Sequence, residues 1–182
     1  DSPLAINITE VFKAHPECFD KETLAVYKYD DDPFGFDKLS YVRDVQESKK
    51  INSLRDSCII ISASGMCEAG RVLHHLKNNV GNSQNTVLIV GFMASNTLGR
   101  KLLEKWPRVK IFGEEYNVRA ETVVIDAFSA HADRDDLIGY VRGAQKNVRG
   151  VFLVHGEESQ GYALAEGLKE AGIDKVKVPH PG

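Results

Sequence analysis

A repeated alternation of apolar runs, glycine-bearing loops and helical segments constrains the fold of this chain more than any other feature. Residues 58–62 and 86–90 are short apolar runs, each followed by a glycine-bearing loop, at 62–70 and 91–99, and then by a helical pattern. Strand, loop and helix in this order, taken twice, indicate right-handed βαβ units. Wholly apolar runs are typical of buried parallel strands. The sequence therefore predicts an α/β fold with a parallel sheet, whose ligands bind where the strands' carboxyl ends meet the loops.

The rest of the chain continues the alternation with shorter segments. Two β segments, 109–112 and 116–119, flank a glycine-containing turn and predict a hairpin. The further elements that we expect are strands at 121–125, 150–154 and 176–178 and helices at 133–141 and 160–171.

Composition narrows the class of protein. The 182 residues are 42% hydrophobic and 27% charged, values of an ordinary globular chain, which argues against disorder. No apolar run approaches the roughly 20 residues that span a bilayer, so we expect no membrane partner. The net charge of −3 argues against an extended basic surface for nucleic acid, so any such contact must be local.

Three widely spaced cysteines favour reduced thiols over a disulfide framework, and hence a cytoplasmic location. The chain starts at Asp1 without an initiator methionine, and we expect it to be a piece of a longer protein.

Two histidines occupy positions that are typical of binding or catalytic residues. His131 and His155 each follow a strand-like run and precede a helical pattern. Exposed N–H groups at a helix start favour an anion, and an imidazole there can bind a metal or donate a proton. Asp133 and Glu157, two residues beyond each histidine, could orient the rings as outer-shell acceptors. Spacing alone identifies no reaction.

The motifs around these histidines resemble a known family. Ser129-Ala-His-Ala-Asp133 and Val154-His-Gly-Glu157 are similar to two signature motifs of the β-CASP branch of the metallo-β-lactamase superfamily, a branch of nucleic-acid-processing nucleases. The resemblance covers nearly the whole chain. Further segments that resemble the family, in the family's order, are residues 1–5, 61–66 and 97–100.

The resemblance implies roles for both histidines. His155 matches the histidine that completes the coordination of one zinc ion in many members. His131 matches a histidine placed near the scissile phosphate, where it assists the leaving group.

The resemblance also implies contacts with RNA phosphate. Ser62, Ser64 and Gly65 match a loop that faces the RNA cleft. Arg100 is similarly placed, although a structural ion pair explains an arginine there equally well.

Several family features are absent from this sequence. The main metal motif, His-x-His-x-Asp-His, is missing, as are the isolated ligands and the acidic residue that come earlier in the family. Met93 and Asn96 stand where relatives often carry Gln and Gly, which alters the expected substrate contacts. A metal site needs converging ligands, which the remaining histidines do not offer: His15, His74, His75 and His180. We therefore expect two zinc ions in the intact parent protein and none held by this chain alone.

The resemblance thus implies part of a zinc-dependent ribonuclease, folded but inactive by itself. Residues 1–121 would belong to the β-CASP domain and residues 122–182 to the C-terminal, RNA-specificity segment of the metallo-β-lactamase domain. The expected partners are RNA and the missing N-terminal part of the same protein, and exposed apolar surface also favours a homodimer.

Three alternatives remain open. The parent could be a non-catalytic RNA-binding or scaffold protein, a nuclease acting on DNA, or a small-molecule hydrolase. The last lacks support because such enzymes generally have no β-CASP insertion.

Overall fold

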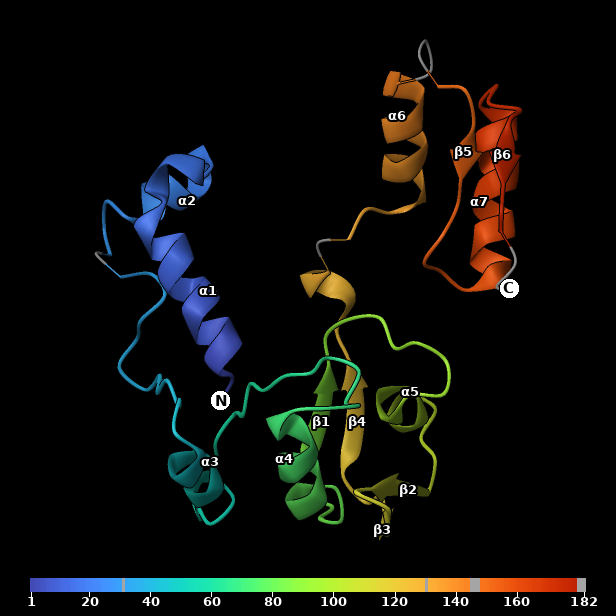
Figure 1. Ribbon diagram of the computed structural model, residues 1–182. Coiled ribbons are helices and arrows are strands. Elements are labelled where there is room, and N and C mark those ends of the chain that lie inside the picture. Colours follow the sequence, from blue (N-terminus) through green and yellow to red (C-terminus); the bar gives the residue numbers. More distant parts are fainter. Residues whose placement is uncertain (31, 130, 145–147, 180–182) are drawn as a thin grey trace. The chain divides into compact units, whose positions relative to one another are not determined.

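A computed structural model describes residues 1–30, 32–129, 131–144 and 148–179. The chain divides into two compact units, Asp1–Ser129 and Ala130–Gly182, called unit 1 and unit 2 below. Figure 1 gives the course of the chain through both. The prediction that the tail residue His180 is no metal ligand lies outside the described residues.

Unit 1 contains the longer series of elements. Its helices are α1 (Pro3–Ala14), η1 (Pro16–Cys18), α2 (Lys21–Val26), α3 (Val45–Ile51), α4 (Arg71–Asn79), α5 (Leu98–Leu103) and η2 (Asp126–Phe128). Its strands are β1 (Thr86–Ile89), β2 (Arg108–Ile111), β3 (Glu114–Asn117) and β4 (Glu121–Val124).

A parallel strand pair lies at the centre of unit 1. β1 pairs with β4 in a register that runs from Thr86 opposite Glu121 to Ile89 opposite Val124. In Figure 1 the two strands lie between α4 and α5. Parallel pairing needs a crossover connection, which the segment containing α5 and the β2–β3 hairpin supplies. This arrangement confirms the predicted α/β fold class.

The predicted hairpin is also confirmed. β2 and β3 are antiparallel, with Arg108 opposite Asn117 and Ile111 opposite Glu114. Phe112 and Gly113 make the turn, both with positive φ (52° and 82°), the conformation that a tight two-residue hairpin turn requires.

The core of unit 1 joins two helices to the hairpin. Leu102 on α5 and Val80, which directly follows α4, are fully buried. Loss of apolar surface to water is the main force that holds such elements together. The buried members of this cluster are Cys67, Leu76, Val80, Leu98, Leu102, Val109 and Ile111.

The predicted strand at residues 58–62 is wrong. Within the part of the chain that the structure describes, no strand pairs with this segment, and the sheet that contains β1 has β4 as its other strand. Ile59 and Ile61 are 89% and 72% exposed instead of buried. An apolar run becomes a strand only where a neighbouring backbone satisfies its hydrogen bonds.

Unit 2 repeats the alternation on a smaller scale with α6 (Arg134–Ala144), β5 (Val151–Phe152), α7 (Glu158–Glu170) and β6 (Val176–Lys177). β5 and β6 form a parallel pair. α6 and α7 are in contact, and an ion pair of 3.6 Å joins Arg134 to Glu170. The start of α6 therefore lies beside the last turn of α7. Among the described residues, every helix is too short or too polar to cross a membrane.

Candidate functional site

His131 lies, exposed, in the segment that leads into α6. This segment is anchored by a reciprocal cap at the helix start. Oδ1 of Asp133 accepts hydrogen bonds from the backbone N–H groups of Asp135 and Asp136, each at 2.9 Å. The Asp136 carboxylate in turn accepts from the N–H of Asp133 at 3.2 Å. Such a cap satisfies N–H groups that a helix start otherwise leaves open, and it fixes the backbone beside His131.

His155 lies between β5 and α7, and its backbone is in the left-handed region with φ 63°. That region disfavours residues with a Cβ atom and is enriched at functional sites. The ring is exposed, and Gly156 follows it. Glu157 occupies the N-cap position of α7 without a side-chain capping bond. The first turn of α7 therefore presents backbone donors close to His155.

The structure places the two histidines at different points of unit 2. His131 lies three residues before α6, whose first residue, Arg134, contacts Glu170 in the last turn of α7. His155 lies three residues before the first turn of α7. His155 follows β5, as predicted, whereas the helix η2 separates His131 from β4, so the predicted strand-end position of His131 is wrong.

The described residues do not form a complete metal site. No group of three or more His, Cys, Asp or Glu side chains that could hold an ion occurs among them. His155 offers one ligand of a type that zinc accepts, whereas a zinc site needs three or four converging ones. The residues that the structure describes therefore do not supply such a set.

In unit 1 the 62–70 loop folds back onto itself. The N–H of Ser64 donates to the Ala69 carbonyl at 3.1 Å, and the Ser64 hydroxyl accepts from the Ala69 N–H at 3.3 Å. Gly70 closes the loop with φ 84°, and a Cβ atom there would lie 2.6 Å from the Ala63 carbonyl oxygen. Gly65, near the tip, is exposed and has open space around its Cα.

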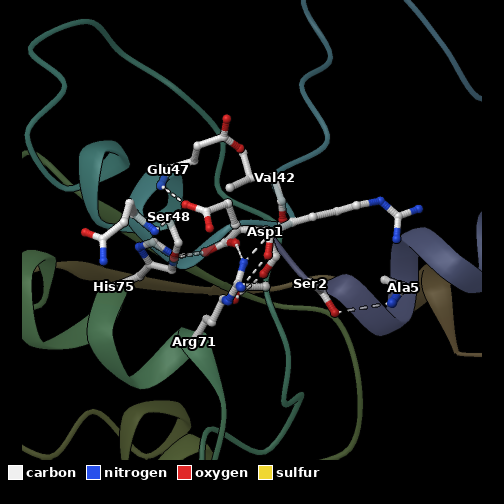
Figure 2. A network of polar contacts seen from close by, with 12 residues as sticks. Asp1, Ser2, Ala5, Val42, Glu47, Ser48, Arg71 and His75 are labelled. Atoms are coloured by element: carbon white, nitrogen blue, oxygen red, sulfur yellow. Dashed lines mark hydrogen bonds and ion pairs between the residues drawn. The ribbon is translucent and has the colours of Figure 1, made fainter.

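A buried polar cluster underlies this loop (Figure 2). The Asp1 carboxylate, which has no exposed side-chain surface, accepts from Nη1 of Arg71 at 2.5 Å and from the Ser48 hydroxyl at 2.5 Å. Nε2 of His75 lies 2.7 Å from Oδ2 of Asp1, the oxygen that also accepts the hydrogen bond from Ser48, whereas Arg71 contacts Oδ1. The Ser62 hydroxyl donates to the Asp1 backbone carbonyl at 2.9 Å. This cluster, the Asp1 cluster, connects the start of α1 with α3, α4 and the loop.

Sequence reasoning did not find the Asp1 cluster. It set His75 aside as a metal ligand and named no partner for it. One signal was available: Arg71 and His75 are four residues apart and therefore share a face of α4.

Arg100 lies on α5, with its side chain 36% exposed and its Nε 2.6 Å from Oε1 of Glu104. This hydrogen bond is the largest cause of the lowered pKa of the Glu104 carboxyl. The Gly99 N–H donates to the Met66 carbonyl at 3.0 Å, and the Leu98 N–H donates to the Glu68 carboxylate. α5 is thus joined to the 62–70 loop, which brings Arg100 together with Ser64 and Gly65 in one part of unit 1.

The α/β fold, the exposed histidines before α6 and α7 and the folded serine–glycine loop can be compared with known proteins. Residues 1–102 match the Beta-Casp domain family. Residues 115–179 match the family described as the Zn-dependent metallo-hydrolase RNA specificity domain. The chain belongs to the Beta-Casp family, which confirms the resemblance; the boundary predicted between residues 121 and 122 stays a prediction.

Named relatives support this assignment. The chain is 32% identical over 172 residues to Ribonuclease TTHA0252 of Thermus thermophilus, an alignment of 94% of this chain and 39% of the relative. It is 28% identical over 177 residues to Transcription termination factor FttA of Methanocaldococcus jannaschii, covering 94% of this chain and 28% of the relative. The FttA of Cenarchaeum symbiosum is 32% identical over 165 residues, covering 85% and 25%. The chain therefore spans two fifths or less of these relatives.

Proposed function

We propose that this chain is part of a zinc-dependent ribonuclease of the metallo-β-lactamase fold, which hydrolyses RNA phosphodiester bonds. The observation that carries the proposal is the exposed His155, whose backbone lies in the left-handed region between β5 and α7, within the segment that matches the RNA specificity family. The similarity to a protein named a ribonuclease supports it.

In this proposal His155 supplies one zinc ligand, and the remaining ligands come from parts of the protein outside this chain. Two bound metal ions would polarise the phosphate and supply hydroxide. The left-handed backbone of His155 supports the assignment, because a conformation that costs free energy persists where function needs it.

His131 is proposed to donate a proton to the departing 3′-oxygen, or to stabilise its charge. Its exposed ring is accessible to a substrate, and the cap made by Asp133 limits the motion of its backbone. Asp133 and Glu157 are both proposed to orient an imidazole, although Oδ1 of Asp133 also caps α6.

The 62–70 loop and Arg100 are proposed to contact RNA phosphate. The Ser64 hydroxyl accepts a bond from Ala69 and keeps its own proton for a phosphate oxygen. The Ser62 hydroxyl donates its proton to Asp1, so Ser62 is a weaker phosphate ligand than Ser64. The Gly65 N–H and the Arg100 guanidinium are the other two groups proposed to contact the phosphate.

We further propose a cytoplasmic protein whose partners are RNA, the remainder of its own chain and a second copy. Cys18, Cys58 and Cys67 form no disulfide in the structure, in keeping with a reducing compartment. The exposed apolar side chains of Ile59 and Ile61 require a covering surface, which the remainder of the protein would provide.

The test uses the full-length protein with His155→Asn, His155→Ala and His131→Ala. Asparagine tolerates the left-handed backbone, so His155→Asn separates loss of the ligand from loss of the fold. Both His155 variants should lose zinc, measured by elemental analysis, and RNA cleavage should fall at least about 100-fold. His131→Ala should keep its zinc while kcat falls about 10²–10⁴-fold.

His74→Ala, which removes another exposed imidazole, is the control and should change neither quantity. Undiminished zinc and cleavage in both His155 variants would overturn the proposal. A wild-type protein that binds RNA without cutting it would be a scaffold, and one that prefers DNA would be a DNA nuclease.

A further inference from the structure

A hollow of about 310 Å³ lies in unit 1 where β1 and β4 end. Ile89, Met93 and Leu103 contribute an apolar lining, and Phe92, with 59% of its surface exposed, stands at the loop that follows β1. The carboxyl ends of parallel strands are where α/β sheets bind their ligands. The volume falls at the lower end of the range for small-ligand sites, about 300–1,000 Å³.

The polar groups of the hollow carry both signs of charge. Arg100 and Asp126 both line it. An isolated phosphate would be attracted by the first and repelled by the second. A nucleobase fits better, because it is flat and apolar on its faces and carries both hydrogen-bond donors and acceptors on its edge.

We propose that this hollow binds one base of the RNA strand, stacked on Phe92. The inference rests on the proposed function and names the substrate group that this part of unit 1 takes. Proteins that bind single-stranded RNA commonly stack its unpaired bases on exposed aromatic rings.

Asp126 and Arg100 read the edge of the base. The Asp126 carboxylate accepts from an exocyclic amino group, which adenine, cytosine and guanine carry and uracil lacks. The Arg100 guanidinium, whose Nε lies 2.6 Å from Oε1 of Glu104, would donate one hydrogen bond to a ring nitrogen or carbonyl oxygen of the base and another to the phosphate of the same nucleotide, the contact proposed above. The hollow should therefore favour a base with an amino group over uracil.

The position of α5 connects this base site to the 62–70 loop. Through the hydrogen bond of 3.0 Å from Gly99 to Met66, the helix that carries Arg100 adjoins the loop that carries Ser64. A nucleotide with its base in the hollow can thus have its phosphate at the loop.

The test measures RNA binding by the full-length protein with Phe92→Ala, Phe92→Tyr and Phe112→Ala. Phe112 is the matched control, since it is a phenylalanine of unit 1 with similar exposure (52%) at the hairpin turn. Fluorescence anisotropy gives the affinity for short labelled oligo(A), oligo(C) and oligo(U), whose integrity is checked on gels. Thermal melting verifies that each variant is folded.

We expect Phe92→Ala to weaken binding of oligo(A) about 5- to 150-fold, the range that loss of one base–aromatic stack gives. Phe92→Tyr should bind like the wild type, and so should Phe112→Ala. Asp126→Asn should reduce the preference for oligo(A) and oligo(C) over oligo(U).

Equal affinities of Phe92→Ala and Phe112→Ala would overturn the inference, even in a protein that cleaves RNA. A wild type that does not cleave RNA would instead contradict the proposed function. The comparison of Phe92→Ala with Phe112→Ala would still test whether the hollow binds a base. Binding of free AMP as tight as that of oligo(A) would assign the hollow to a mononucleotide and overturn its assignment to the RNA strand.

Discussion

At the scale of single residues, surroundings give the same side chain different chemistry. Cys67 is buried in the core of unit 1, where burial, and then the neighbouring Glu68 charge, raises the pKa of its thiol to about 11. Cys18 and Cys58 are exposed. Because the thiolate is the reactive form, the position of each cysteine in the fold determines its reactivity.

We therefore predict that iodoacetamide at pH 8 modifies Cys18 and Cys58 and leaves Cys67 intact. With its raised pKa, only about one Cys67 thiol in a thousand is ionised at pH 8, and this fraction increases as the pH rises toward 11. Peptide mass spectrometry after timed labelling measures the three rates, and labelling in urea serves as the control for complete reaction. Equal rates for all three cysteines in the folded protein would contradict the prediction.

At the scale of elements, the Asp1 cluster joins segments that are distant in the sequence. Arg71 on α4 also donates to the backbone carbonyls of Val42 and Arg43, at 3.3 and 2.6 Å. The cluster therefore holds α1, α3 and α4 around a single buried carboxylate. Removal of one partner from a buried ion pair leaves the other charge without compensation.

Asp1→Ala should lower the free energy of unfolding by about 3–5 kcal/mol, because it leaves the Arg71 charge unpaired. Asp20→Ala is the control: it removes another aspartate before a helix, the exposed cap of α2, and should cost about 1 kcal/mol. Urea unfolding followed by circular dichroism gives both values. Similar losses for the two variants would show that the cluster is not a stabilising centre.

The elements also show which parts of the fold local sequence patterns predict. The strand β4, the hairpin and the helices before and after β1 follow from hydrophobic periodicity and turn residues. Residues 58–62 have the same apolar pattern as β1 but no strand partner among the described residues. Strand pairing depends on a neighbouring backbone, and the sequence pattern of one segment does not show whether such a neighbour is present.

At the scale of the whole molecule, the candidate residues are divided between the units. His131 and His155 belong to unit 2, and Ser64, Gly65 and Arg100 belong to unit 1. The described residues of neither unit supply a set of metal ligands, whereas the relatives are more than twice as long as this chain.

We predict that the 182-residue chain alone neither retains zinc after dialysis nor cleaves RNA, because a zinc ion needs three or four converging ligands. The full-length protein should bind two zinc ions and cleave. Elemental analysis and gel assays of both proteins, with circular dichroism to verify folding, make the comparison. Stoichiometric zinc or metal-dependent cleavage in the chain alone would contradict the prediction.

The sequence by itself determined the α/β alternation, the family and the location of His155 between a strand and a helix, because these features depend on residues close together along the chain. The tertiary structure alone decided the pairing of β1 with β4, the Asp1 cluster and the hollow beside Phe92. The contacts of Asp1 with Ser48, Arg71 and His75 span 47, 70 and 74 positions. Local periodicity carries no record of such contacts, since they form only when distant segments pack and exclude water together.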